Sequence, residues 1–278
     1  MVKKLLKRTR NILRANPSAI YDKEKHLANK SFYFKGNNRK AVLLLHGWSA
    51  TPYEVRRLGK YLNEAGYTVY GPMLSGHGTS PKDLEDVKYE DWIRDTNNFI
   101  NKLRDGYDKV YVGGTSMGAT LALYAAKERE DISGLVLMAT PYKVRYEKIG
   151  TVTLKFLRIF KKYRKKFYPP TFGSRNTITR LISYQEYPIS SVLELAELIK
   201  KTREDLSRIT QPCFIMQSST DHIVTRSSMN NIYKEIGSQK KKKKCIRKAY
   251  HTFISDTKNE HIFRDILNFI ESIQEDSL

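Results

Sequence analysis

The sequence has few cysteines, few glycines and prolines and no long apolar run, and each shortage excludes a class of protein. Only 2 of its 278 residues are cysteines, which excludes a disulfide scaffold and favours a reducing compartment. With 15 glycines and 9 prolines it is neither collagen-like nor of low complexity. No stretch of about 18 uninterrupted apolar residues is present, so we expect no membrane-spanning helix and a cytoplasmic protein, associated at most with a membrane surface.

Acidic residues are also scarce relative to basic ones. The 29 Asp and Glu residues stand against 50 Lys and Arg, which gives a formal net charge of +21. Such an excess is found in proteins that bind nucleic acid or an anionic membrane, and also in proteins with a merely lysine-rich surface. Hydrophobic residues make up 40% of the chain, enough for the core of one large domain or two smaller ones. Composition alone does not show whether the positive charge reflects binding to nucleic acid, binding to an anionic membrane or only a lysine-rich surface.

The first 30 residues form a basic N-terminal extension. From Val2 to Leu13 apolar residues recur at helical spacing with Lys and Arg between them, which predicts a short amphipathic helix. Its apolar stretch is too short for a secretion signal. Two interpretations stay open: the helix docks on the body of the protein or extends freely from it, or it anchors the chain at a membrane surface.

Strands and helices alternate along most of the remaining chain. This order predicts an α/β fold with a mostly parallel central sheet flanked by helices. We expect residues 31–140 and 211–278 to form this core, with the last two strands at Pro212–Gln217 and Lys244–Tyr250. Residues 141–210 show helical patterns and no predicted strand, so we expect a helical cap inserted before the last two strands.

Beyond the extension, basic residues gather in two places. The predicted cap helix Thr153–Phe167 has aromatic residues along one side and Lys and Arg along the other. The run Lys240–Lys244 is expected in a solvated, hairpin-like loop ahead of the last strand. It lacks the interleaved aromatic residues that stack on bases, and no nucleic-acid motif is present, so we expect no nucleic acid partner.

The strongest catalytic signal is the pentapeptide Gly114–Gly118, which has the form G-x-S-x-G. It directly follows a predicted strand and opens a predicted helix, and in that context it indicates a nucleophile elbow. The turn is so tight that Gly114 and Gly118 must be small. Ser116 is then the nucleophile, and the backbone N–H of Met117 faces the developing oxyanion.

A second oxyanion donor is expected in the loop after the predicted strand Ala41–Leu45. There Gly47 lets the backbone approach a substrate, and the N–H of Trp48 is the donor while its ring lines the acyl pocket. His46 precedes the serine at a strand end, so bracing this loop is a simpler role for it than that of catalytic base. His77, on the same rim, is expected to be a structural hydrogen-bonding group, with direct substrate contact as the alternative.

A serine nucleophile needs a base, and the base needs an orienting carboxylate. Asp221 and His251 each follow a predicted strand, at the edge where open α/β sheets place their sites. We assign Asp221 as the acid and His251 as the base. His222, which adjoins the acid, and His261, at the start of the last helix, are the competitors. The sequence contains no metal-ligand cluster and no nucleotide-binding loop, so we expect no metal and no cofactor.

Taken together, these segments resemble the α/β-hydrolase superfamily, and more narrowly the small bacterial carboxylesterases and monoacylglycerol lipases. The segments are Leu44–Ser49, Ser75–Gly78, Gly114–Gly118, Asp221–Val224 and Tyr250–His251, with Ser191–Leu198 and Asp205–Ile209 in the cap. The resemblance implies cofactor-free ester hydrolysis. It also implies the triad Ser116, Asp221 and His251, with Trp48 and Met117 as oxyanion donors. Trp48 stands where these enzymes commonly have Phe.

The residues and the resemblance predict a serine hydrolase that cleaves carboxylic esters through an acyl-enzyme. The expected substrates are short- to medium-chain acyl esters or monoacylglycerols. The alternatives are the same triad acting on thioesters, amides or carbohydrate esters, and a non-catalytic, basic surface-binding protein on a hydrolase fold. The expected partners are a small-molecule ester or lipid and an anionic membrane, contacted through the basic extension and the cap.

Overall fold

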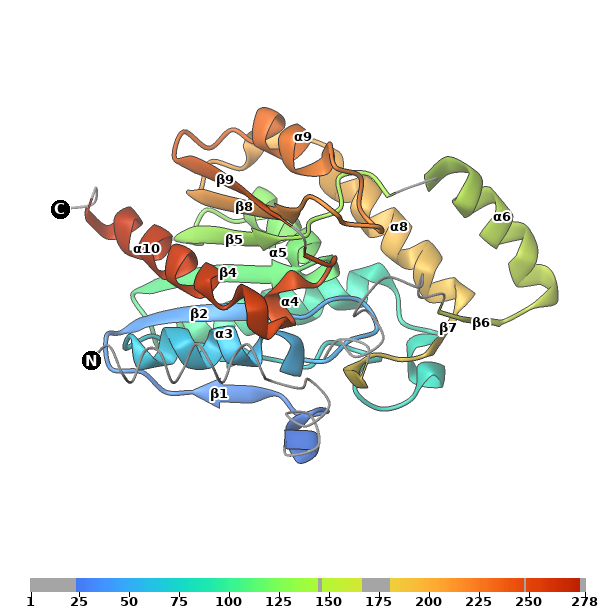
Figure 1. Ribbon diagram of the computed structural model, residues 1–278, viewed down its shortest axis with the longest axis horizontal. Coiled ribbons are helices and arrows are strands. Elements are labelled where there is room, and N and C mark those ends of the chain that lie inside the picture. The colour runs from blue at the N-terminus through green and yellow to red at the C-terminus, as the bar shows by residue number, and fades with distance from the viewer. Residues whose placement is uncertain (1–23, 145–146, 167–180, 248, 276–278) are drawn as a thin grey trace.

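The computed structural model describes residues 24–144, 147–166, 181–247 and 249–275, built around a seven-stranded sheet (Figure 1). The strand order is β1-β3-β2-β4-β5-β8-β9, and all neighbours are parallel except β1 against β3. The strands are β1 (Phe32–Phe34), β2 (Lys40–Leu45), β3 (Thr68–Gly71), β4 (Lys109–Thr115), β5 (Gly134–Met138), β8 (Cys213–Ser218) and β9 (Lys241–Ile246). The predicted α/β fold with a mostly parallel sheet is confirmed.

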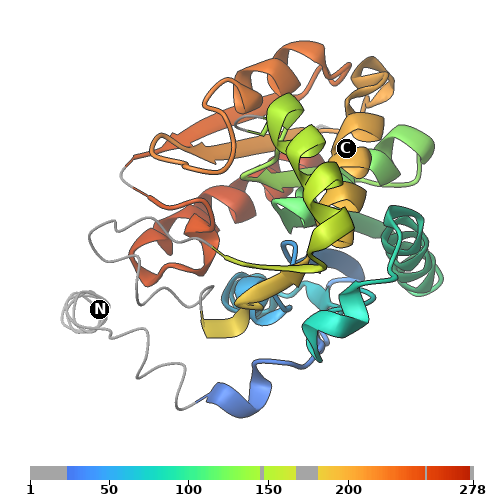
Figure 2. The same ribbon diagram turned by 90° about the vertical axis from the view of Figure 1, so that its right-hand side faces the viewer.

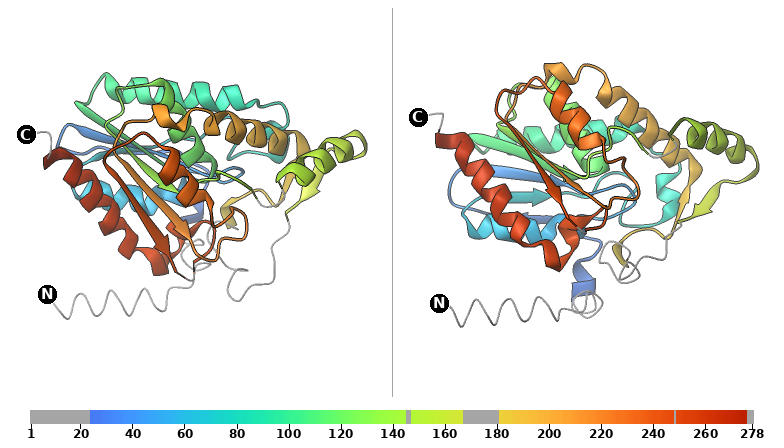
Figure 3. Two further views of the ribbon diagram at one scale, coloured as in Figure 1. Left: turned by 90° about the horizontal axis from the view of Figure 1, so that it is seen from above. Right: turned by 45° about the horizontal axis from the view of Figure 1, so that its top comes forward.

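Helices cover both faces of the sheet, with α3 and α10 on one side and α4 and α5 on the other (Figure 3). The helices of these layers are α3 (Tyr53–Glu64), α10 (His261–Glu275), α4 (Tyr89–Arg104), α5 (Met117–Glu128) and α9 (Ser228–Glu235). Short 3₁₀ turns are η1 (Lys25–Leu27), η2 (Pro81–Leu84), η4 (Leu206–Arg208), η5 (Phe253–Ser255) and η6 (Thr257–Asn259).

Strand β2 shows why the apolar run in the sequence forms a central strand. Its side chains alternate between two hydrophobic clusters: Leu43 and Leu45 pack with α4 and α5, whereas Val42 and Leu44 pack with α3 and α10. A strand covered on both faces needs apolar residues at every position. The apolar run therefore predicts both that these residues form a strand and that the strand lies in the interior of the sheet.

The chain leaves the sheet after β5 and returns at β8, and we call residues 141–210 the inserted segment. Its described elements are α6 (Glu147–Phe160), β6 (Tyr163–Lys165), β7 (Glu186–Pro188) and α8 (Ile189–Arg203). α6 projects beyond the carboxyl ends of the parallel strands (Figure 1), and in Figure 2, viewed from that end, it lies in front of the sheet.

The expectation that this segment lacks strands was wrong. The predicted helix Thr153–Phe167 ends at Phe160, and Tyr163–Lys165 pairs antiparallel with Glu186–Pro188. The Tyr163 hydroxyl also donates a hydrogen bond to Glu85, 2.7 Å away on a rim loop. These partners are distant in sequence, so a local helical pattern does not reveal them.

The last strand also differs from its prediction, because β9 begins at Lys241 and ends at Ile246, ahead of the predicted range Lys244–Tyr250. The lysine run therefore forms the edge strand of the sheet and not a loop. Its ammonium groups find partners on both sides: Lys241 and Lys243 over the ring of Tyr233, Lys242 over that of Phe214, and Lys244 against Asp265. Lysines on an edge strand discourage pairing with another sheet.

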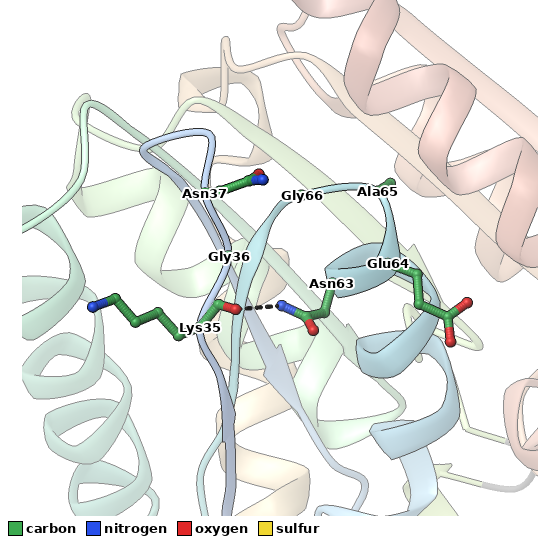
Figure 4. A pocket seen from close by; sticks show the side chains of 7 residues that line it. All are labelled: Lys35, Gly36, Asn37, Asn63, Glu64, Ala65 and Gly66. Atoms are coloured by element: carbon green, nitrogen blue, oxygen red, sulfur yellow. Dashed lines mark hydrogen bonds between the residues drawn. The ribbon is translucent and has the colours of Figure 1, made fainter.

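A surface hollow lies at the amino ends of the parallel strands (Figure 4). It is lined by Lys35, Gly36, Asn37, Asn63, Glu64, Ala65 and Gly66. The Asn63 amide donates to the carbonyls of Lys35 and Tyr67 at 2.9 and 3.0 Å, so its polar group serves the turn itself. The loops that carry the predicted catalytic residues lie at the opposite, carboxyl ends of the strands.

None of the described helices is long and apolar enough to cross a membrane. The amphipathic helix predicted between Val2 and Leu13 lies outside the described residues.

Candidate active site

Ser116 occupies the sharp turn between β4 and α5, with φ 52° and ψ −113°. A side chain rarely adopts this region, so the surrounding structure must hold it there. A Cβ at Gly114 would clash with the backbone of Gly118, and one at Gly118 would clash with the carbonyl of Leu45. The two glycines of the motif are thus required by close backbone approach on either side of Ser116.

Asp221 and His251 come together from the loops after β8 and β9. His251 Nδ1 lies 2.8 Å from Asp221 Oδ2, and Oδ1 accepts the backbone N–H groups of Ile223 and Val224 at 2.8 and 2.9 Å. Burial would raise the pKa of Asp221, but His251 and the two N–H donors lower it below its ordinary value. Asp221 is therefore an ionised carboxylate within hydrogen-bonding distance of the His251 imidazole.

Because Nδ1 faces Asp221, Nε2 is the His251 nitrogen available to the predicted nucleophile, Ser116. Within the described residues, the Ser116 hydroxyl makes no hydrogen bond to His251. Contacts of this kind are often long in the absence of substrate and tighten in the reacting complex.

Residues 46–52, which connect β2 to α3, form a loop that we call the oxyanion loop. A Cβ on Gly47 would stand 3.7 Å from the Cβ of Ser116, so the loop packs directly against the serine turn. In the described part of the chain, the backbone N–H groups of Trp48 and Met117 donate to no protein acceptor. Two donors of this kind beside a serine are what a tetrahedral oxyanion requires.

His46 and His77 hold the oxyanion loop in place. Leu74 N–H donates to His46 Nε2 at 3.2 Å, and Ser49 N–H donates to His77 Nε2 at 2.9 Å. Burial lowers the pKa of His46 well below its ordinary value and that of His77 to about 4. Both imidazoles are therefore neutral acceptors in the loop framework, which agrees with the structural roles expected for them.

Two charged side chains at this loop were not singled out from the sequence. Glu54, in the first turn of α3, accepts the Gly47 N–H at 2.7 Å. Lys166, in the inserted segment, donates to the Ser49 hydroxyl and lies 5.4 Å from the centre of the Trp48 ring. Acidic residues are common in the first turn of a helix, so the position of Glu54 in the sequence gave no indication of a functional role.

The inserted segment packs on the same loop through aromatic residues. The ring of Tyr187 meets that of Trp48 edge-on at 4.9 Å. The Tyr184 N–H donates to the Ser49 carbonyl at 2.9 Å, and the Tyr184 hydroxyl donates to the Gly76 carbonyl at 3.1 Å. The segment therefore joins two rim loops beside the predicted nucleophile.

Comparison with known proteins identifies the family of the chain. The sequence model of the family described as serine aminopeptidase, S33, matches residues 36–258. The chain belongs to this family of α/β-hydrolases. This hydrolase is similar to the carboxylesterase of Bacillus subtilis (strain 168), with 30% identity over 246 residues that cover 88% of this chain and 97% of the relative.

A second relative is the thermostable monoacylglycerol lipase of Bacillus sp. (strain H-257), 31% identical over 239 residues that cover 85% of this chain and 92% of the lipase. A solved structure described under the metagenome-derived lipolytic enzymes LipS and LipT aligns with a TM-score of 0.80 at 27% identity, covering 88% of this chain and 98% of that one. The hydrolase is thus an enzyme of the carboxylic ester hydrolase class, as predicted.

Proposed function

We propose that the hydrolase cleaves carboxylic esters with a triad formed by Ser116, His251 and Asp221. The observation that carries this proposal is the 2.8 Å contact between His251 and Asp221, next to a serine held in a nucleophile elbow. As Ser116 Oγ attacks the ester carbonyl, His251 Nε2 takes its proton, and Asp221 stabilises the resulting imidazolium.

The tetrahedral oxyanion is stabilised by the N–H groups of Trp48 and Met117. His251 then gives the proton to the leaving alcohol, which departs and leaves an acyl group on Ser116. A water molecule, deprotonated by the same histidine, attacks this acyl-enzyme and releases the carboxylic acid. Loss of one oxyanion donor typically costs about 10²–10³ in rate.

The proposed substrates are short- to medium-chain acyl esters and monoacylglycerols. Trp48 of the oxyanion loop and Tyr187 of the inserted segment together supply an aromatic wall, which suits an acyl chain. The names of the two Bacillus relatives support the same classes. We further propose that the inserted segment acts as a cap over the site.

Hydrolysis of p-nitrophenyl esters of graded acyl length, of monoacylglycerols and of an acyl thioester tests this function. We expect the wild type to turn over the oxygen esters, and Ser116→Ala to lose that turnover while keeping the wild-type circular dichroism spectrum. A folded Ser116→Ala protein with wild-type esterase activity contradicts the triad, and a strong preference for the thioester contradicts the substrate class.

The outer face of α6 supports a second element of the proposal, which is contact with an anionic lipid surface. Four large apolar side chains stand exposed there: Val152 (70%), Phe156 (62%), Ile159 (73%) and Phe160 (75%). The exposed cations Arg158 and Lys161 lie on the same helix or directly after it, and Lys162, which follows them, pairs with Glu85. Apolar residues flanked by cations match the interface of a negatively charged membrane, where each Lys or Arg contributes about 1 kcal/mol.

A further inference from the structure

Glu54 places a carboxylate in the interior of the enzyme, directly under the oxyanion loop. The residue is 2% exposed, its Oε2 accepts the Gly47 N–H at 2.7 Å, and its Oε1 has no hydrogen-bond partner among the described residues. A buried carboxylate with one unsatisfied oxygen is unfavourable for folding, and an apolar residue of similar size would pack there at lower cost. The carboxylate therefore calls for a reason other than stability.

Its position relative to the catalytic groups supplies that reason. The same Gly47 that donates to Glu54 also packs against Ser116, and the peptide after it carries the Trp48 N–H. Fixing the Gly47 backbone thus fixes the orientation of the next peptide, whose N–H is the proposed oxyanion donor. A hydrogen bond to a charged acceptor holds such a peptide more firmly than a neutral one.

Two groups that can carry a positive charge act electrostatically on Glu54: His251, in the loop after β9, and Lys166, in the inserted segment. Lys166 contacts the oxyanion loop at Ser49 and Trp48. Among the described residues, Lys166 forms no ion pair with any carboxylate.

The two arginines of α3 next to Glu54 are engaged elsewhere. Arg56 lies over the rings of Phe32 and Phe34, and Arg57 pairs with Glu260. The groups whose positive charge acts on the Glu54 carboxylate are therefore Lys166 and, once it has taken a proton, His251.

We infer that Glu54 is a positioning residue: its ionised carboxylate anchors the oxyanion loop through Gly47 and supplies a counter-charge to the imidazolium that His251 becomes during catalysis. This inference rests on the proposed triad. Burial raises the pKa of Glu54 to about 7, against the opposing effects of the Gly47 N–H, His251 and Lys166. The carboxylate thus changes its charge around pH 7, with the ionised form prevailing at higher pH and the neutral form at lower pH.

Glu54→Gln tests the inference, because the amide keeps the shape and an acceptor for Gly47 but has no charge. At pH 8.5 we expect kcat for a p-nitrophenyl ester to fall about 10-fold with KM within about 2-fold, a loss smaller than that of a whole oxyanion donor. The ratio of wild-type to variant kcat should shrink towards 1 below about pH 6, where Glu54 of the wild type is itself neutral. Glu64→Gln removes the same charge from the exposed end of α3 and should leave kcat unchanged.

Lys166→Met gives a second arm that leaves the buried carboxylate in place. Lys166 lowers the pKa of Glu54, so its loss should move the Glu54-dependent fall in activity to higher pH. The same substitution should cause no such shift in a Glu54→Gln background. The Lys166→Met single variant still tests the inference if Glu54→Gln does not fold, which thermal unfolding monitors.

A wild-type to Glu54→Gln ratio that is the same at every pH, or a Lys166→Met profile that does not move, overturns the inference and leaves Glu54 a structural residue. Failure of the proposed function has a different signature. In that case the wild type does not hydrolyse esters, or Ser116→Ala hydrolyses them as fast as the wild type.

Discussion

His251 and Asp221, 30 residues apart in the chain, meet through a 2.8 Å contact between Nδ1 and Oδ2. The second aspartate oxygen is held by two backbone N–H groups of its own loop, at Ile223 and Val224. The carboxylate is thus fixed from one side and fixes the imidazole on the other. In the proposed triad, this contact leaves Nε2 as the His251 nitrogen that exchanges the proton with Ser116.

Asp221→Asn should lower kcat by about 10³–10⁴-fold while the fold is retained, because an amide no longer enforces the tautomer or stabilises the imidazolium. Steady-state kinetics on a p-nitrophenyl ester measures the loss. Asp108→Asn, at an exposed carboxylate paired with Arg39, is the matched control and should match the wild type. A loss below about 10-fold in folded Asp221→Asn would place the orienting acid elsewhere.

Gly118→Ala should destabilise the protein by at least about 2 kcal/mol, because the new Cβ would clash with the carbonyl of Leu45 in a packed core. Gly106→Ala is the control, since a Cβ there meets nothing within 4 Å and should change stability by less than about 0.5 kcal/mol. Urea unfolding of both variants gives the comparison. If Gly118→Ala and Gly106→Ala were equally stable, the turn at Ser116 would have space for a Cβ at position 118, contrary to the clash described above.

Glu54→Gln should flatten the pH dependence of stability. The pKa of Glu54 is raised in the folded state from 4.5 to about 7, so the folded state binds the proton more tightly and the wild type loses stability as pH rises between these values. The loss is on the order of 3 kcal/mol, and the variant should lack it. Unfolding free energies at pH 4.5 and pH 8 measure the difference. If the free energy of unfolding of the wild type instead increased with pH relative to that of Glu54→Gln, the pKa of Glu54 would not be raised in the folded state.

Replacing Phe156, Ile159 and Phe160 with serine should release the enzyme from anionic vesicles. The substitutions remove apolar side chains that are largely exposed, so stability and hydrolysis of a water-soluble ester should stay unchanged. Flotation with phosphatidylserine-containing and neutral liposomes is the measurement, and Tyr33→Ser, which alters an exposed aromatic residue of β1, is the control. Equal recovery of the wild type with both vesicle types would contradict contact with an anionic surface.

Much of the core could be predicted because its signals are local. The apolar run of β2 and the strand–glycine–serine–glycine–helix order of the elbow are properties of neighbouring residues, and the structure places both as expected. The boundaries of β9 could not be predicted, since a row of lysines forms a strand only where Tyr233, Phe214 and Asp265 lie on its two sides.

The candidate site could be predicted in part. Asp221 and His251 could be paired because each follows a strand and they come in the expected chain order, which are general features of open α/β sheets. Glu54 and Lys166 reach the oxyanion loop only through tertiary packing, from the first turn of one helix and from the inserted segment. The separation of positions 54 and 166 in the sequence does not predict that both side chains contact the same loop.

Labelling with a fluorophosphonate probe, followed by mass spectrometry, tests directly whether Ser116 is the nucleophile. We expect one adduct, on Ser116, formed in step with the loss of esterase activity, and no adduct on Ser116→Ala. His251→Ala should slow the labelling strongly, because the hydroxyl then lacks its base. Inactivation with the adduct on a different residue, or undiminished labelling of Ser116→Ala, would contradict it.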